Sequence, residues 1–169
     1  YSDQGDRDTP DGRLPDTNFR NNGQGVWLGY NFDRHKIGLS LDRYKLSTQT
    51  WFDDPEGQFD DFSVKIPKLE REKIGLFYDY AADGDYLKKI HLDAYTQTIE
   101  RKFENRVKTT QVIPSPAIKA LTINNQTNTN DKQYTQGVTL QGNFSLPANN
   151  ELVIGTQYQH DKIKQDTDG

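Results

Sequence analysis

Residues 26–41 read VWLGYNFDRHKIGLSL, and they contain two alternating segments on either side of Asp33-Arg34. Every second residue before this pair is large and apolar: Val26, Leu28, Tyr30 and Phe32. The alternation resumes after the pair at Ile37, Leu39 and Leu41. A period of two is typical of a β-strand, because successive side chains point to opposite faces of a sheet. The stretch therefore predicts two antiparallel strands joined by a two-residue turn.

The same plan recurs along the rest of the chain. We expect six strands, at residues 24–32, 35–51, 70–80, 86–103, 134–146 and 151–160. Short connections at 33–34, 81–85 and 147–150 alternate with long loops at 52–69 and 104–133, and the polar segment 1–20 reads as a loop. The sequence therefore predicts an all-β fold, an antiparallel meander of about six long strands.

The alternation of short and long connections indicates the kind of sheet. Outer-membrane β-barrels have short periplasmic turns and long extracellular loops, and each strand needs about 9–11 residues to cross the bilayer. Charged residues such as Lys36, Lys73, Asp79 and His91 occupy the faces opposite the aliphatic ones, as expected beside a wet or protein-filled lumen. We therefore expect residues 1–169 to be part of a transmembrane β-barrel, with no plug domain present.

Composition agrees with a barrel wall, in which only every second residue must be apolar. Of the 169 residues, 32 % are apolar, and the mean hydropathy is −0.97. The 8 Phe, 9 Tyr and 2 Trp are too many for ordinary disorder. A net charge of −4 argues against a nucleic-acid partner, and the absence of cysteine excludes disulfides. The sequence contains no run of about 18 apolar residues, so it predicts no transmembrane helix.

Aromatic residues flank the short turns, at Tyr30, Phe32, Tyr80, Tyr86 and Phe144. Amphipathic rings favour the membrane–water boundary, so these residues predict a girdle at one membrane interface. The general preference of aromatic residues for strands is the alternative explanation. Beyond Leu41, Arg43 and Lys45 take the parity of the aliphatic residues. Either the strand has left the membrane there, or a β-bulge has shifted its register.

Two passages resemble the TonB-dependent outer-membrane receptors: residues 29–51, GYNFDRHKIGLSLDRYKLSTQTW, and residues 70–97, EREKIGLFYDYAADGDYLKKIHLDAYTQ. The run LDRY at 41–44 and the spacing from Arg71 to Tyr78 are similar to the heme and haemoglobin receptor branch. The closing segment 138–161 resembles a hairpin of the same barrels. The resemblance extends over most of residues 19–160.

The resemblance implies a barrel of 22 strands with a plugged lumen, in the outer membrane of a Gram-negative bacterium. Such a receptor imports heme, haemoglobin iron or a ferric siderophore, and the TonB complex drives it through the plug. The plug and the heme-ligating loop of that branch are not in this chain, so we expect no cofactor in the segment itself. The expected partners are therefore outer-membrane lipid, the TonB complex and the iron-containing ligand. Because six strands leave two open edges, we also expect the isolated segment to self-associate.

Ligand or partner contacts are expected at His160, Trp51, Phe52, Phe59 and Phe62. Imidazole is a common ligand of iron and heme, and His160 ends the last predicted strand near the extracellular rim. The four aromatic residues surround an acidic run in the first long loop, and aromatic residues are favoured where a surface binds a partner. The acidic spacing fits no EF-hand, so the sequence assigns no metal site.

Other classes of function make different predictions for this sequence. No Ser-His-Asp set, glycine-rich phosphate loop or HExxH motif is present, so we expect the chain not to be an enzyme. A soluble β-sandwich for binding or adhesion and a passive, porin-like barrel are the alternatives. A sandwich would seal the aliphatic side chains between two layers of one compact unit, whereas a barrel wall would leave them exposed.

Overall fold

The computed structural model describes residues 1–50, 57, 59–111 and 120–168, and most of them form one long antiparallel sheet. Its seven strands follow the order β1-β4-β5-β6-β7-β8-β9. Their bounds are Ser2–Gln4 (β1), Phe19–Phe32 (β4), His35–Thr50 (β5), Asp61–Ala81 (β6), Leu87–Gln111 (β7), Leu121–Leu146 (β8) and Asn150–Asp168 (β9). The predicted all-β meander of six long strands, β4 to β9, is confirmed. No helix in this part of the chain is both long and apolar enough to cross a membrane.

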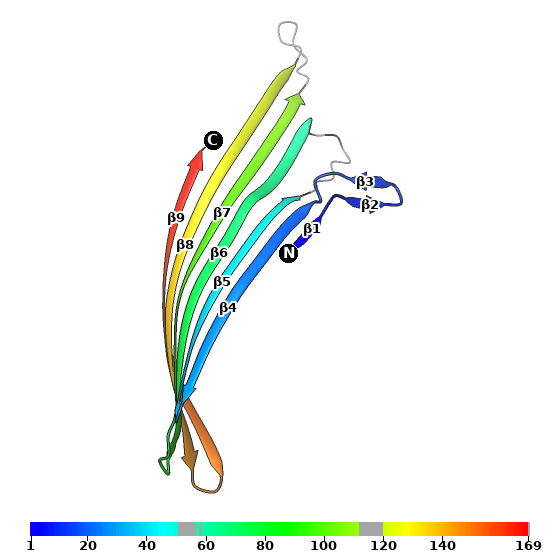
Figure 1. The fold of residues 1–169 in the computed structure, drawn as a ribbon. Coiled ribbons are helices and arrows are strands. Elements are labelled where there is room, and N and C mark those ends of the chain that lie inside the picture. Colours follow the sequence, from blue (N-terminus) through cyan, green and yellow to red (C-terminus); the bar gives the residue numbers. More distant parts are fainter. Residues whose placement is uncertain (51–56, 58, 112–119, 169) are drawn as a thin grey trace.

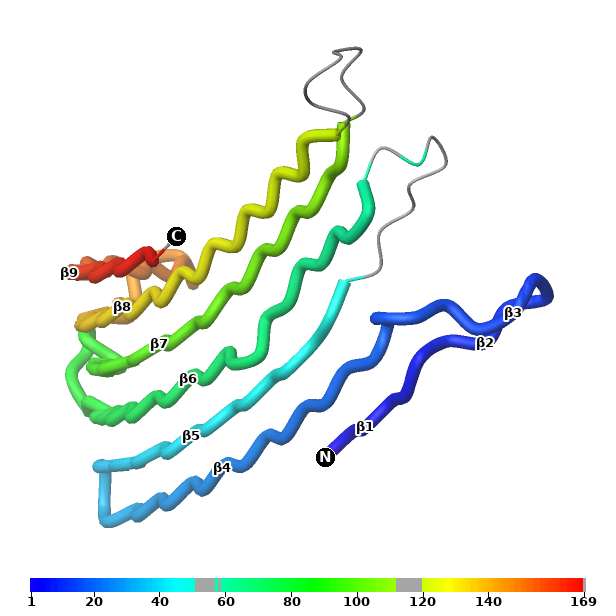
Figure 2. Tube along the Cα trace, turned by 90° about the horizontal axis from the view of Figure 1, so that it is seen from above, coloured from blue at the N-terminus to red at the C-terminus, as the bar shows by residue number. Residues whose placement is uncertain are grey.

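The six long strands form a single curved layer. They lie side by side in chain order and bend together along their length (Figure 1). Seen from above, the layer is an open arc with β4 at one edge and β9 at the other (Figure 2). The short strands β2 (Arg7–Thr9) and β3 (Gly12–Leu14) pair with each other and project to the side of β4 (Figure 1).

Tight turns at one end of the sheet set the register of each hairpin. Asp33 has a φ of 49°, and Ala148 and Asn149 have φ values of 63° and 56°. Left-handed backbone of this kind matches the twist of two paired strands, and Asp and Asn tolerate it better than most residues. The Asp33-Arg34 turn places Phe32 opposite His35, so Gly29 must lie opposite Gly38.

The strands are longer than the sequence predicts, and the expected loops are correspondingly wrong. β6 already begins at Asp61, β7 continues to Gln111 and β8 begins at Leu121, so the predicted loops at 52–69 and 104–133 are largely strand. Likewise, residues 1–20 contain three short strands and the start of β4, and β9 runs on to Asp168. The prediction relied on apolar alternation, whereas backbone hydrogen bonds between neighbouring strands need no apolar side chain and favour residues such as threonine on both faces.

The register of β5 resolves the ambiguity at Arg43 and Lys45. Pairing with β6 is unbroken from His35 to Leu46, and the irregularity lies beyond, between Leu46 and Thr48. A bulge before Arg43 is therefore excluded. Arg43 and Lys45 lie on the same face as Ile37 and Leu41, and the apolar character of that face simply ends between Leu41 and Arg43.

No hydrophobic side chain of the described residues is buried, so the sheet has no core. One face, here named the apolar face, carries aliphatic residues on every long strand, gathered toward the end of the sheet with the tight turns. Its middle row contains Leu28, Leu39, Leu76, Ala94, Val138 and Tyr158 in register order from β4 to β9. The opposite side is named the polar face.

Charged residues on the apolar face form a belt beyond the aliphatic rows, away from the tight turns. The charged belt consists of Arg43, Lys45, Lys68, Glu70, Glu72, Glu100, Lys102, Lys132, Lys162, Lys164 and Asp166. Glu100 lies at its centre, with its carboxylate oxygens 2.5 Å from Lys68 Nζ and 2.7 Å from Lys132 Nζ. Glu70 accepts a 2.7 Å hydrogen bond from Arg43 Nε and lies 3.3 Å from Lys45 Nζ. The pairs link four neighbouring strands.

The belt holds its central carboxylate ionised. Hydrogen bonds from Lys132 and Lys68 lower the pKa of Glu100 to about 2, from an ordinary value of 4.5. A carboxyl whose pKa is depressed by folding stabilises the folded state above its unfolded pKa, and loses this contribution as the pH falls through the folded value. Glu100 should therefore stabilise the sheet at neutral pH and cease to do so between about pH 4.5 and pH 2.

We predict that Glu100→Gln lowers the urea midpoint of unfolding at pH 7, because Lys68 and Lys132 lose their shared partner. The variant should also show a shallower fall in stability from pH 4.5 to pH 2 than the parent protein. Unfolding curves in detergent micelles across this range measure both effects. The control is Glu104→Gln on the same strand and face, since Glu104 forms no ion pair within the described ranges. An unchanged pH profile in Glu100→Gln would contradict the assignment.

Candidate functional site

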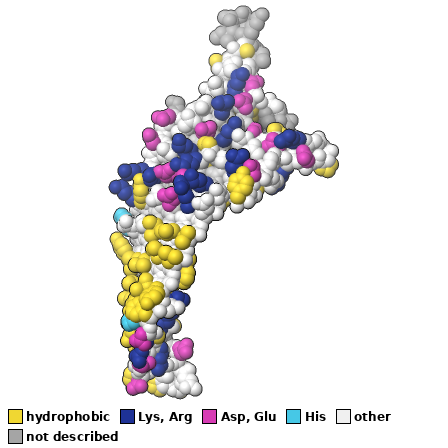
Figure 3. Space-filling model, viewed as in Figure 1, with side chains coloured by type: hydrophobic (Ala, Val, Ile, Leu, Met, Phe, Trp, Pro, Cys, Tyr) yellow, Lys and Arg dark blue, Asp and Glu magenta, His cyan; other side chains and the backbone are white. Residues whose placement is uncertain are grey.

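Aliphatic side chains of the apolar face are exposed on every long strand. Exposed fractions are 60 % for Leu28, 49 % for Leu76, 47 % for Leu140 and 57 % for Ile154. The space-filling view shows hydrophobic side chains gathered over the turn-side half of the long strands, with charged groups above and below them (Figure 3). Exposed apolar patches that extend beyond a few hundred square ångströms are unusual in soluble proteins and mark contact with a partner or a membrane.

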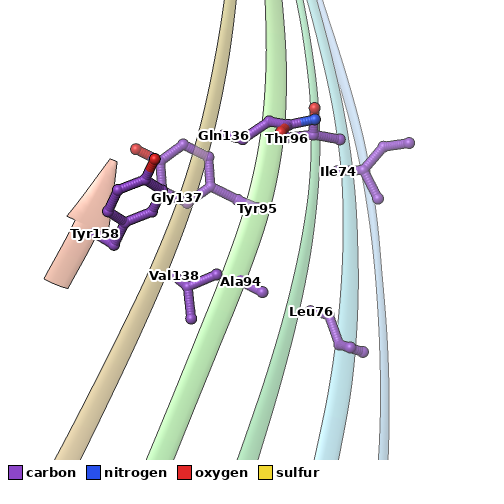
Figure 4. Close-up of a pocket in the computed structure, with 9 residues that line it drawn as sticks. All are labelled: Ile74, Leu76, Ala94, Tyr95, Thr96, Gln136, Gly137, Val138 and Tyr158. Atoms are coloured by element: carbon purple, nitrogen blue, oxygen red, sulfur yellow. The ribbon is translucent and has the colours of Figure 1, made fainter. Parts of the chain in front are cut away.

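A shallow hollow of about 390 Å³ interrupts this face near its middle. It lies over Ala94, whose small side chain is flanked in its row by Leu76 and Val138 (Figure 4). The hollow is open and lined mainly by apolar groups. Thr96, Gln136 and Tyr158 add polar groups to its lining, but its openness and mainly apolar walls suit contact with an apolar chain better than enclosure of a polar ligand.

Aromatic rings border the apolar face at the turn end. His35 stacks on Phe32 with 4.8 Å between ring centroids, lies 5.0 Å from the Tyr80 ring, and has its Nδ1 2.7 Å from the hydroxyl oxygen of Tyr78. Tyr30 stacks on Phe32 at 5.7 Å. Tyr30 and Tyr86 are each 68 % exposed. The aromatic residues predicted near the turns therefore lie near one end of the sheet, and His35 and Tyr78 join them.

The polar face carries aromatic rings that lie flat over glycines. The rings of Trp27 and Phe77 occupy the space where side chains at Gly29 and Gly38 would begin, since a Cβ at either glycine would come within 2.0 Å of a ring atom. Trp27 and Phe77 stack with 6.1 Å between centroids. Tyr95 lies over Gly137 of the neighbouring strand in the same way (Figure 4). Glycine gives the rings room to lie against the backbone.

Charged side chains surround these rings. His91 stacks on Phe77 at 6.4 Å, and its Nδ1 lies 2.6 Å from Asp79, which also pairs with Lys89 at 3.0 Å. Lys36 lies 5.6 Å from the centroid of Phe77, and Lys73 lies 4.7 Å from that of Tyr95. We name Trp27, Phe77 and His91 the aromatic platform. Flat rings beside cations offer a surface for stacking and cation–π contact.

The predicted ligand contacts are not brought together. His160 lies on the apolar face in the row of Ile74, and β9 continues past it, so it does not end the last strand. Phe62 lies twelve residues from Ile74 along β6, roughly 35–40 Å away. Phe59 and Phe62 contact each other, with ring centroids 5.5 Å apart. Trp51 and Phe52 lie outside the described residues.

Strict alternation implies that Trp27, next to Leu28, and Phe77, next to Leu76, lie on the polar face, but the aromatic platform itself was not predicted. The signal was available in part, because the two-residue turn forces Gly29 opposite Gly38, and two facing glycines leave a gap that rings can cover. The pairing of Phe77 with Gly38 required the register between β5 and β6, which the sequence did not supply because residues 51–60 intervene.

Comparison with known proteins adds no family to this description. The chain matches no protein-family model, and no curated protein matches it significantly. Among the residues that the structure describes, no three His, Asp or Glu side chains are grouped closely enough to hold a metal ion.

We predict that Gly38→Val displaces the Phe77 ring and destabilises the sheet by about 1–3 kcal/mol, because the new side chain overlaps the ring. The loss of the Trp27–Phe77 stack should also shift the tryptophan emission of the folded protein. Gly23→Val is the matched control on the same face, since a Cβ there meets only Tyr44 at 3.8 Å. Combining Gly38→Val with Phe77→Ala should cost less than the sum of the single changes. Strict additivity would show that ring and glycine do not interact.

Proposed function

We propose that this sheet is part of the wall of a transmembrane β-barrel in an outer membrane, with the apolar face against lipid and the polar face toward the lumen. The observation that carries the proposal is the exposure of aliphatic side chains on one face of all six long strands, with no hydrophobic side chain buried in the described part of the chain. A β-sandwich would seal that face under a second layer, and the described residues provide none.

The length of the apolar face supports the proposal. On single strands the apolar residues of this face extend over seven residues, from Val26 to Phe32 on β4 and from Val138 to Phe144 on β8. Because these stretches are staggered between strands, the face as a whole extends over nine residues, from the row of Val26 to the row of Leu152. A transmembrane β-strand needs about 9–11 residues. The aromatic residues border the apolar length on the turn side, and the charged belt borders it on the other side. This order is the one expected across a membrane, from one interface through the hydrocarbon to the opposite interface.

The two open edges are consistent with a larger wall. β9 is exposed along its whole length, and β4 pairs with β1 only at Phe19–Asn21. Because the six long strands alternate in direction, β4 and β9 run antiparallel to each other. An even number of further strands, from elsewhere in a longer chain or from a second copy, would close the sheet with antiparallel pairing throughout, as in bacterial barrels.

The transport activity that we propose is uptake of an iron-containing ligand, namely heme, haemoglobin iron or a ferric siderophore, by a TonB-dependent receptor. Support for this activity comes from the resemblance of residues 29–51 and 70–97 to those receptors. The polar face agrees with it, since ion-paired side chains and exposed rings suit a lumen that is filled by water or by a plug rather than by hydrocarbon.

The proposed orientation predicts that two adjacent residues of β8 differ in their tolerance of a charged side chain. Leu140 lies on the apolar face and Thr139 on the polar face. Leu140→Lys should lower the stability of the protein folded in lipid vesicles by about 2–4 kcal/mol, because a lysine near the middle of the bilayer loses hydration. Thr139→Lys, the matched control, should change it by less than about 1 kcal/mol. Urea unfolding in vesicles measures both, and equal losses would argue against lipid contact on one face only.

The proposed transport predicts a growth phenotype. In a Gram-negative host that lacks its own receptors, the full-length protein should allow growth with heme or a ferric siderophore as the sole iron source. Deleting the TonB complex of the host should abolish that growth. Passage of small solutes that does not need TonB would instead favour the passive porin, and a protein that stays monomeric in water without detergent would exclude both barrels.

A further inference from the structure

The charged belt has an excess of positive charge at a defined height on the sheet. It contains seven basic and four acidic side chains, a net charge of +3, whereas the whole chain carries −4. All eleven lie on the apolar face, directly beyond the aliphatic rows. Positive charge is therefore concentrated where, under the proposed function, the sheet leaves the hydrocarbon and enters the headgroup region.

The belt does not neutralise itself. Arg43, Lys45, Lys68 and Lys132 each contact Glu70, Glu72 or Glu100. Within the described ranges, Lys102, Lys162 and Lys164 form no ion pair, and all three are exposed. Lys102 lies directly opposite Lys68, and Lys164 lies directly opposite Lys132.

Like charges at directly opposite positions of an antiparallel pair are unfavourable unless an anion lies between them. Their Cβ atoms are about 4.5–5.5 Å apart, so two flexible lysine side chains can reach one tetrahedral anion from both sides. Three of the four belt carboxylates, Glu70, Glu72 and Glu100, pair with cations of β5, β6 and β8, and the fourth, Asp166, forms no ion pair in the described part of the chain. Lys102 on β7 and Lys162 and Lys164 on β9 are therefore left without an ion-paired carboxylate there.

We propose that Lys102, Lys162 and Lys164, with Lys132, bind the phosphate groups of membrane lipid headgroups. The proposal rests on the proposed membrane location. Lipid phosphates are the anions present at the edge of a bilayer, and basic residues near such an anionic surface are attracted to it. The exposed Tyr158 and Ile154 continue the same surface toward the turns, where acyl chains of the same lipids would lie. Bound headgroups would thus fix the height of the sheet in the membrane.

The test compares the full-length protein in vesicles of phosphatidylcholine alone and in vesicles that also contain phosphatidylglycerol. Anionic lipid should raise the urea midpoint of unfolding, and added salt should reduce this increase because the charges are exposed. The triple variant Lys102→Gln/Lys162→Gln/Lys164→Gln should lose half or more of the increase. The matched control Lys36→Gln/Arg71→Gln/Lys73→Gln removes the same charge from the polar face and should keep the full increase.

Insertion is measured separately, by protection of the protein from added protease. Protein that inserts but responds equally to anionic lipid in parent and triple variant would overturn the headgroup proposal and leave the barrel wall standing. Protein that never inserts would overturn both. An equal loss in both triple variants would show that total charge, rather than the belt, attracts the anionic lipid, and would also overturn the proposal.

Discussion

Backbone hydrogen bonds between antiparallel neighbours are the interaction on which every other feature of this sheet depends. They join every neighbouring pair from β4 to β9, with register shifts at Leu46/Thr48, Lys65/Lys68 and Leu87/Lys89, and they hold the sheet together although none of its described hydrophobic side chains is buried. Because side chains alternate strictly between the two faces, a fixed register fixes both faces at once. The tight turn at Asp33-Arg34 sets this register for the first hairpin, and the remaining strands extend it.

The two faces of the sheet differ in chemistry, because one is apolar and the other is polar. One face exposes Leu28, Leu76 and Leu140, and only an apolar environment removes that surface from water. The other face places rings over glycines and charges beside the rings, as at Phe77, Gly38 and Lys36. Because the described residues form no core, the apolar side chains of the sheet can be buried only by what surrounds the sheet. The medium that contacts each face is therefore central to how the sheet works.

The charged belt both links neighbouring strands and marks the end of the apolar face. Its carboxylates, with Glu100 at the centre, connect four strands by ion pairs, and those pairs extend the sheet beyond the apolar length. A single exposed ion pair adds little to the stability of the folded state. In a network that shares a carboxylate, each added pair loses less side-chain entropy. The belt also marks the height at which lipid contact would change from acyl chains to headgroups.

The sequence by itself determined the all-β fold, the short turns and the side to which each residue of the alternating segments points, because period-two alternation and turn chemistry are local properties. The alternation implies that Leu28 and its neighbour Trp27 lie on opposite faces, as they do in the structure. The extent of the strands, the Glu100 ion pairs and the Phe77–Gly38 contact were decided only by the tertiary structure. The Phe77–Gly38 contact and the Glu100–Lys132 ion pair depend on the register between strands that are separated by long connections. Polar residues such as those at 121–133 pair through backbone atoms, so they leave no apolar pattern in the sequence from which that register could be predicted.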